Sequence, residues 1–143
     1  MLKRLLLILA LLLPSALSAQ SRWWSIYADT TQPGARFYDQ ATLVDSGNYV
    51  TGFIRVKSQF TSDTTVDGKP YASTTYQMTA DCKRKLERMD AAFYYNTAGV
   101  NIDSFQAIQS LNPLKRPVPE SVGETDMRAL CLMARQQKLK KRR

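Results

Sequence analysis

Histidine is absent from the whole 143-residue chain, and this absence removes several kinds of chemistry at once. There is no usual general base, no Ser-His or Cys-His nucleophile pair, and no imidazole ligand for zinc. The acidic residues are scattered and lack the spacing of a metal-binding loop. No nucleophile elbow, phosphate-binding loop or dinucleotide fingerprint is present. The sequence therefore predicts a protein that is not an enzyme, without a catalytic residue, metal site or cofactor.

Long hydrophobic runs are also missing. The apolar run Leu5–Leu13 follows a short basic stretch and is ended by Pro14 and small residues. This layout is typical of a secretory signal peptide, whereas a membrane-spanning helix needs about 20 apolar residues. We expect a signal peptide over 1–19, with cleavage between Ala19 and Gln20 or one residue earlier, and an exported protein without a transmembrane segment.

Cysteine is scarce, with Cys82 and Cys131 as the two copies. Neither lies near the expected cleavage point, so the thiol that a lipid anchor would need is missing there. An oxidising compartment favours a disulfide between them. Cys82 shares a face with Tyr76 and Met78 in an alternating stretch, and Cys131 lies in the apolar stripe of an expected helix, so both are expected to face the core. The alternative is two buried free thiols.

Alternation of polar and apolar residues indicates strands through most of the chain. The expected strands are Ser21–Thr31, a short one within Ala35–Val44, then Tyr49–Phe60, Tyr71–Cys82, Lys85–Tyr95 and Val100–Ile108. Asp45–Asn48 has the composition of a hairpin turn. The segment 83–96 is ambiguous, because its first half has good helix formers, but the aromatic residues at its end favour a strand.

The C-terminal part of the chain changes character. Asn112–Glu120 is rich in proline and is expected to be an extended crossing segment. Ser121 and Glu124 then fit a capping box, which predicts a helix from Val122 to Gln137. The whole is an α+β domain over 20–137, with a single antiparallel sheet, a C-terminal helix stapled to it, and a disordered basic tail over 138–143.

Several ordered motifs resemble a known family. The chain has YVTGFIRV in a strand, YQMTADCKRK around Cys82, YYNTAGVNIDS after it, and a final PESVGE with Cys131 downstream. Together they resemble the surface-adhesin protein E-like family of Gram-negative bacteria. The resemblance implies an antiparallel sheet of about six strands with a helix tied to it by a disulfide. It also implies an envelope or surface protein, the best-known type of which is an adhesin for host matrix and serum proteins such as vitronectin and laminin.

One strand face has the composition of a protein-binding surface. Aromatic and cationic side chains alternate onto the same side of the third strand, at Tyr49, Phe53, Arg55 and Lys57. A mixed solvent face is the plainer interpretation. Trp23 and Trp24 are expected to divide between the core and a sheet edge, with an aromatic ligand platform as the alternative.

The formal net charge of +8 is concentrated at the C-terminus, in Lys138, Lys140, Lys141, Arg142 and Arg143. These residues are candidates for binding an anionic glycan or lipopolysaccharide, against the plainer view of a solvated end. Nucleic acid is disfavoured because no aromatic residue is interleaved with the charges. The leading hypothesis is a non-catalytic, adhesin-like module, in the periplasm or at the cell surface, that binds a host or envelope protein. The alternative is a periplasmic accessory or assembly factor of an envelope machine.

Overall fold

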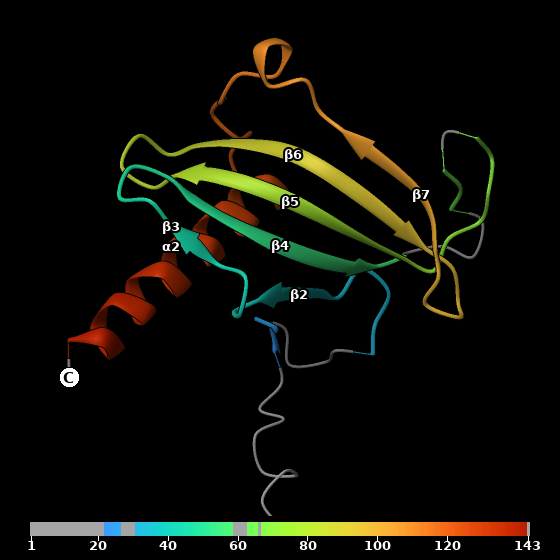
Figure 1. Cartoon of the computed structure of the whole chain (residues 1–143), viewed down its shortest axis with the longest axis horizontal. Helices are drawn as coiled ribbons and strands as arrows, with labels where there is room; N and C mark the ends of the chain where they lie inside the picture. The colour runs from blue at the N-terminus through green and yellow to red at the C-terminus, as the bar shows by residue number, and fades with distance from the viewer. Residues whose placement is uncertain (1–21, 27–30, 59–62, 66, 143) are drawn as a thin grey trace, which may run out of the picture.

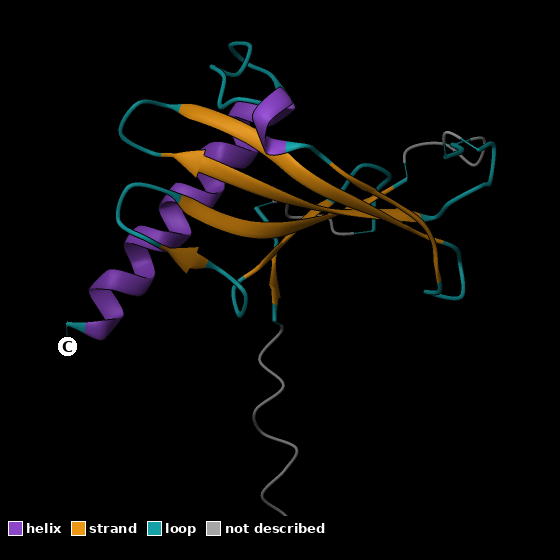
Figure 2. Cartoon of the chain, turned by 45° about the horizontal axis from the view of Figure 1, so that its top comes forward, coloured by secondary structure: helices purple, strands orange, loops and turns teal. Residues whose placement is uncertain are grey.

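The computed structural model describes residues 22–26, 31–58, 63–65 and 67–142. In this part of the chain, one antiparallel sheet carries one long C-terminal helix across one of its faces (Figure 1). Figure 2 shows the same arrangement after a rotation, with the helix crossing the strands obliquely. A disulfide between Cys82 and Cys131 joins the two elements. The α+β architecture predicted from the sequence is confirmed.

The strands of the described residues form a single sheet in the order β1-β2-β4-β5-β6-β7, and β3 pairs with the start of β4. All neighbours are antiparallel. The bounds are β1 (Trp23–Trp24), β2 (Arg36–Asp39), β3 (Val44–Asp45), β4 (Val50–Lys57), β5 (Ser73–Asp81), β6 (Leu86–Tyr95) and β7 (Asn101–Gln106). Consecutive long strands are therefore neighbours, as in a meander.

Strands β1, β2 and β4 to β7 lie inside the stretches that alternation predicted. β3 is a second short strand where one was expected, and it extends to Asp45 of the predicted turn. The ambiguous segment 83–96 resolves into a turn over 82–85 followed by β6. The predicted hairpin at Asp45–Asn48 is confirmed, because β3 and β4 pair directly across it and Gly47 has a φ of 89°. The first strand is shorter than predicted and ends at Trp24. Residues 27–30 and 59–62, where longer strands were expected, lie outside the described residues.

The helix α2 (Val122–Lys141) begins at the predicted residue. The Ser121 hydroxyl accepts a hydrogen bond from the Glu124 N–H at 3.3 Å. The Glu124 carboxylate accepts from the Glu120 N–H at 2.7 Å, one residue further back than in a capping box. The first bond satisfies a backbone donor that the helix leaves unpaired at its start, and the second satisfies the donor of the residue before the cap.

The end of α2 differs from the prediction. The helix continues past Gln137 to Lys141 and is capped by Arg142. The prediction of a disordered basic tail is therefore wrong for Lys138–Arg142, and Arg143 lies outside the described residues. Two contacts support the extra turn, a hydrogen bond from Gln137 to the Gln40 carbonyl at 2.9 Å and an ion pair between Lys138 and Asp45 at 2.8 Å. Cations at this end of a helix are also favoured by its dipole.

The hydrophobic core lies between the sheet and α2. Its buried residues are Tyr38, Val50, Ile54 and Met78 from the sheet, with Ala129, Leu130, Met133 and Ala134 from the helix. Gly52 lets the helix come close to β4, because a Cβ there would lie 2.7 Å from Leu130 Cδ2. A glycine in the middle of a strand is thus explained by close helix packing.

The crossing segment runs from β7 back to the helix. It passes through a short 3₁₀ helix, η1 (Gln109–Leu111), and is extended after it, as its prolines predict. Lys115 pairs with Glu87 of β6 in an isolated bridge, and the Asn112 side chain donates to the Met89 carbonyl at 2.8 Å. These contacts tie the segment to β6 and set the position from which α2 starts.

Candidate functional site

Strand β4 divides its side chains between the two faces of the sheet. Gly52 and Ile54 lie against α2, and Ile54 is fully buried. Phe53, Arg55 and Lys57 are half-buried and alternate with these residues, so they lie on the opposite face of the sheet. Figure 1 shows that α2 covers one face of the sheet and leaves the other without a helix. The structure therefore brings these three candidate residues together, as the alternation predicts.

The strand register extends this surface across neighbouring strands. Phe37 of β2 is opposite Arg55, Arg55 is opposite Thr75, and Thr75 is opposite Phe93. Residues paired in this way share a face of the sheet. The set that results, together with Trp23 of β1 and Tyr95 of β6, is called the open face; its members are Trp23, Phe37, Phe53, Arg55, Lys57, Thr75, Phe93 and Tyr95.

Arg55 lies at the centre of the open face. Its guanidinium carbon is 4.4 Å from the centre of the Trp23 ring and 5.9 Å from the centre of the Tyr95 ring. Its Nε donates to Thr75 Oγ1 at 3.3 Å. Cation–π contacts of this kind hold the planar guanidinium against the rings. The expected division of the tryptophans is confirmed, because Trp24 packs toward the core beside Tyr38 at 5.8 Å between ring centres, whereas Trp23 lies in the edge strand β1 and contacts Arg55.

Two hollows flank this arginine. One has a volume of about 310 Å³ and contains the rings of Phe53, Phe93 and Tyr95. The other has a volume of about 670 Å³ and includes Phe37 and Lys57. Trp23 and Arg55 line both hollows and so form the ridge between them. Concave surfaces lined by aromatic rings with a few polar groups are the usual form of a binding site.

The acid in the smaller hollow is already paired. Asp39 is 1% exposed and accepts hydrogen bonds from Arg22 Nε at 2.8 Å and Nη2 at 2.5 Å. Burial acts to raise the pKa of Asp39, but the bonds from Arg22 and from the Ala41 N–H prevail and hold it below its usual value. Asp39 therefore stays ionised and neutralises Arg22, so Arg22 adds no net positive charge to the open face.

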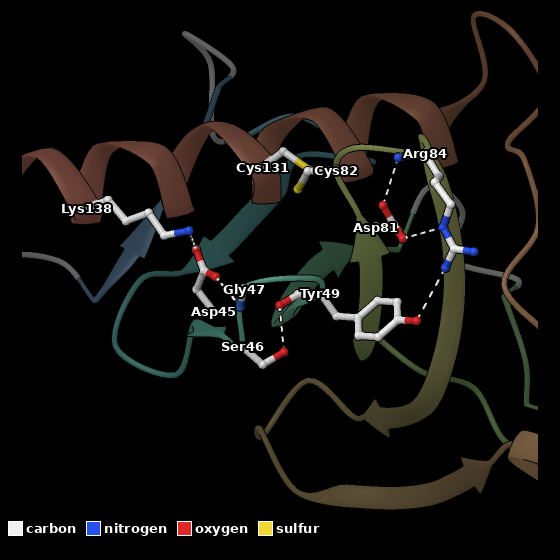
Figure 3. Close-up of a disulfide and its surroundings, with 9 residues drawn as sticks. All are labelled: Asp45, Ser46, Gly47, Tyr49, Asp81, Cys82, Arg84, Cys131 and Lys138. Carbon is white, nitrogen blue, oxygen red and sulfur yellow. Dashed lines mark hydrogen bonds and ion pairs between the residues drawn. A yellow bond between two sulfur atoms is a disulfide. The ribbon is translucent and has the colours of Figure 1, made fainter.

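The disulfide lies at the end of β5, where it joins the sheet to α2 (Figure 3). Cys82 and Cys131 have Cα atoms 5.7 Å apart. Both cysteines are on the predicted faces, but Cys82 is exposed, so the prediction that it faces a buried core is wrong. Strand β5 ends at Asp81, and the turn carries Cys82 beyond the edge of the packed core. The staple therefore ties the rim of the sheet to the middle of α2.

Tyr49 belongs to this second region. It precedes β4, and its hydroxyl accepts a hydrogen bond from Arg84 at 3.3 Å (Figure 3). It lines a hollow of about 690 Å³ with both cysteines and with Arg135 and Lys138. The structure thus separates Tyr49 from Phe53, Arg55 and Lys57, although alternation grouped the four.

The basic residues of the helix end belong to α2 and line neither hollow of the open face. Lys138, Lys140 and Lys141 belong to the last turn of α2, and Arg142 caps it. Lys138 is paired with Asp45, and its hydrogen bond is the main cause of the lowered pKa of that carboxyl. The candidate residues therefore fall into two separate groups, an aromatic and cationic one on the sheet and a purely basic one on the helix.

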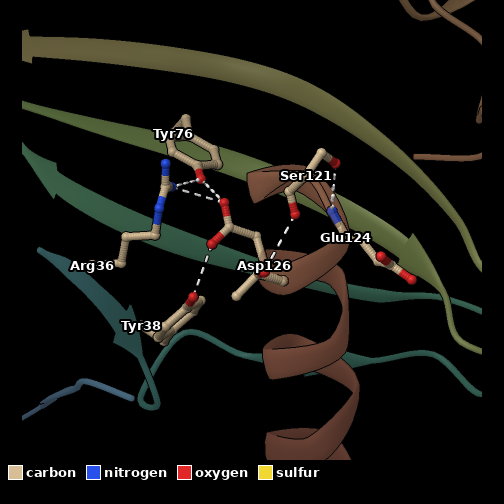
Figure 4. A network of polar contacts seen from close by, with 7 residues as sticks. Arg36, Tyr38, Tyr76, Ser121, Glu124 and Asp126 are labelled. Carbon is tan, nitrogen blue, oxygen red and sulfur yellow. Dashed lines mark hydrogen bonds and ion pairs between the residues drawn. The ribbon is translucent and has the colours of Figure 1, made fainter. Parts of the chain in front are cut away.

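A buried polar network fastens α2 to the sheet (Figure 4). The Asp126 carboxylate accepts hydrogen bonds from Arg36 at 2.9 Å, from the Tyr38 hydroxyl at 2.8 Å, and from the Tyr76 hydroxyl. Burial raises the pKa of Asp126 and also that of Tyr76. Sequence reasoning missed this network. The sequence did contain a sign of this network. Asp126 precedes Leu130 by four residues, so this acid lies on the apolar stripe of the helix.

The family model of surface-adhesin protein E matches residues 23–132. The chain belongs to the surface-adhesin protein E family. No curated protein and no solved structure matches the chain significantly.

The match to the adhesin E family includes some of the candidate residues and leaves others outside. It begins at Trp23 and ends at Leu132, so it contains the open face, the buried network and both cysteines. The basic end of α2 lies outside it. The family identity therefore bears on the sheet and its stapled helix, which are the parts that present the open face.

Two further findings concern this adhesin E chain. In the described ranges, no helix is long and apolar enough to cross a membrane. Among the same residues, no cluster of three or more cysteine, aspartate or glutamate side chains could hold a metal ion.

Proposed function

We propose that this protein is an exported, non-catalytic binding protein that captures a macromolecular partner, a host matrix or serum protein, on its open face. The observation that carries the proposal is the pair of cation–π contacts that Arg55 makes with Trp23 and Tyr95 on the open face. The surface-adhesin family supports a binding role in general terms. In this proposal the open face is the surface that contacts the partner.

The composition of the open face supports this assignment. Aromatic residues and arginine are enriched at protein interfaces and contribute most of the binding free energy there. Phe53 and Phe93 lie 6.5 Å apart between ring centres, and Lys57 lies 5.8 Å from the centre of the Phe37 ring. These rings would lose contact with water on binding, while the cations at their edges would select a partner of complementary charge.

The chemistry of the chain also favours binding over catalysis. The protein has no histidine, and its two cysteines are joined in a disulfide. The paired acid Asp39 is held by Arg22, and the buried acid Asp126 by Arg36. Each is engaged in holding the fold together, so neither is available as a general base.

Charge reversal on the open face tests the proposal. Arg55→Glu with Lys57→Glu should abolish capture of immobilised vitronectin or laminin, or of serum protein, by the purified protein. Lys140→Glu with Lys141→Glu is the matched control, because it makes the same charge change at the helix end. Circular dichroism must show that both variants are folded. Equal capture by the open-face variant and the wild type would reject the open face as the binding site.

The location of the protein has its own test. We propose export through the signal peptide over 1–19, which lies outside the described residues, and exposure at the cell surface without a lipid anchor. Added protease should then digest the protein on intact cells. Protection until the outer membrane is opened would contradict surface exposure and would favour the periplasmic accessory role.

A further inference from the structure

Arg55 is oriented before any partner arrives. Two rings contact its guanidinium group, and Thr75 accepts the hydrogen bond from Nε. These contacts come from β1, β5 and β6, so the side chain is held from several strands of the sheet. An arginine fixed in this way loses little conformational freedom when it binds a ligand.

Among the described residues, the two terminal nitrogens of Arg55 are not paired with an acid. Asp39 lines the same hollow but accepts two bonds from Arg22. Arg55 is half-buried, and the hydrogen bond given for its guanidinium among the described residues comes from Nε. Within the described ranges, the open face thus holds an oriented guanidinium whose terminal nitrogens have neither an ion pair nor a hydrogen bond.

We propose that Arg55 binds the carboxylate of an acidic side chain on the partner, and that a neighbouring apolar side chain of the same segment enters the smaller hollow. The proposal rests on the proposed function, in which the open face captures a protein. A guanidinium presents two parallel N–H donors that match the two oxygens of a carboxylate. The hollow beside it, about 310 Å³ in volume, offers the rings of Phe53, Phe93 and Tyr95 to an apolar group.

A sulfated or phosphorylated polyanion fits this place less well. Such ligands need several cations close together, and here Arg22 is already bound to Asp39. Lys57 lies beside the other hollow, against the Phe37 ring. The cations that are close together belong to the last turn of α2 instead. One oriented guanidinium among aromatic rings matches a single carboxylate with apolar neighbours.

The fluorescence of Trp23 provides a local test, because this ring stacks on Arg55. In a Trp24→Phe background, Trp23 is the sole tryptophan. The probes are acetyl-Phe-Glu-Phe-amide and its glutamine counterpart, which differ in the carboxylate alone. The glutamate peptide should change the Trp23 emission in a saturable way, and the glutamine peptide should bind at least about tenfold more weakly, as expected for a charge-assisted pair.

Variants test whether Arg55 causes the difference in binding between the two peptides. Arg55→Gln should remove the difference between the two peptides, and Arg55→Lys should retain only part of it, because lysine keeps the charge but lacks the fork. Arg135→Gln, on the helix side, is the matched control and should leave the difference unchanged. Equal binding of the two peptides to the wild type would overturn the inference, as would tighter binding of a sulfotyrosine peptide than of the glutamate peptide.

Failure of this inference can be told apart from failure of the proposed function. If the two peptides bind alike while Arg55→Glu with Lys57→Glu still abolishes capture of the protein partner, the open face is the binding site but its ligand group is not a carboxylate. If the peptides are discriminated at Arg55 while capture of the partner is unchanged in the double variant, the anion site is correct and the proposed function is wrong.

Discussion

Replacing Asp126 with alanine should reduce the free energy of unfolding by about 3–5 kcal/mol, the cost of removing one partner of a buried ion pair. Its side chain is 1% exposed, and that of its partner Arg36 is 11% exposed. The variant leaves the Arg36 cation and the hydroxyls of Tyr38 and Tyr76 without their acceptor. The large value applies because water reaches these groups poorly in the fold. Domains have a total stability of about 5–15 kcal/mol, so the loss is a large fraction.

Urea unfolding followed by tryptophan fluorescence measures this loss. The double variant Arg36→Met with Asp126→Leu should recover the part of the loss that comes from the unpaired Arg36 cation, because it removes both charges, whereas the hydroxyls of Tyr38 and Tyr76 still lack Asp126 as acceptor. A loss below about 1 kcal/mol in Asp126→Ala, the value for a solvent-exposed ion pair, would refute the reasoning. So would a double variant that is less stable than Asp126→Ala.

The pH dependence gives a second readout of the same group. Burial raises the pKa of Asp126 above its value in the unfolded chain. The folded state therefore holds this proton more tightly, and the contribution of Asp126 to stability decreases as the pH rises from the unfolded pKa toward the folded one. The lowered pKa values of Asp39, Asp45 and Asp81 act in the opposite direction. The difference in stability between the wild type and Asp126→Asn should therefore depend on pH in this window, and a constant difference would contradict the assignment.

Two other predictions concern the staple and the helix end. Cys82→Ser opens a loop with a sequence separation of 49, and the chain-entropy model gives a loss of about 4 kcal/mol in the free energy of unfolding. Partner capture at low temperature should persist in this variant. Loss of capture in a folded variant would show that the cysteines belong to the binding site. Lys140→Glu with Lys141→Glu should weaken retention on heparin and on anionic vesicles, since each cation near an anionic surface contributes about 1 kcal/mol of binding free energy. Unchanged retention would show that the basic helix end is not a binding surface for these anions.

Alternation along single elements predicted much of the fold. It located β4 to β7 and placed Phe53, Arg55 and Lys57 on one face, because side-chain direction in a strand depends on position alone. Alternation does not show how deeply a side chain is buried, however. Cys82 has the predicted direction but lies past the end of β5, where the turn leaves it exposed.

Other features depend on contacts between distant segments, which a single sequence does not display. Trp23 reaches Arg55 only because β1 pairs with β2 and β2 pairs with β4. The helix was expected to end at Gln137, where the apolar stripe stops, yet contacts to Gln40 and Asp45 support one further turn. Asp126 is polar at a stripe position, and only the assembled fold shows that three donors surround it.

The central claim is that the open face captures the partner. Its most direct measurement is the affinity of immobilised vitronectin, laminin or serum protein for the wild type, for Arg55→Glu with Lys57→Glu, and for Lys140→Glu with Lys141→Glu, all three checked for folding. Capture should be lost in the open-face variant and kept in the helix variant. Capture that survives the open-face reversal, or is lost only with the helix variant, would contradict the claim.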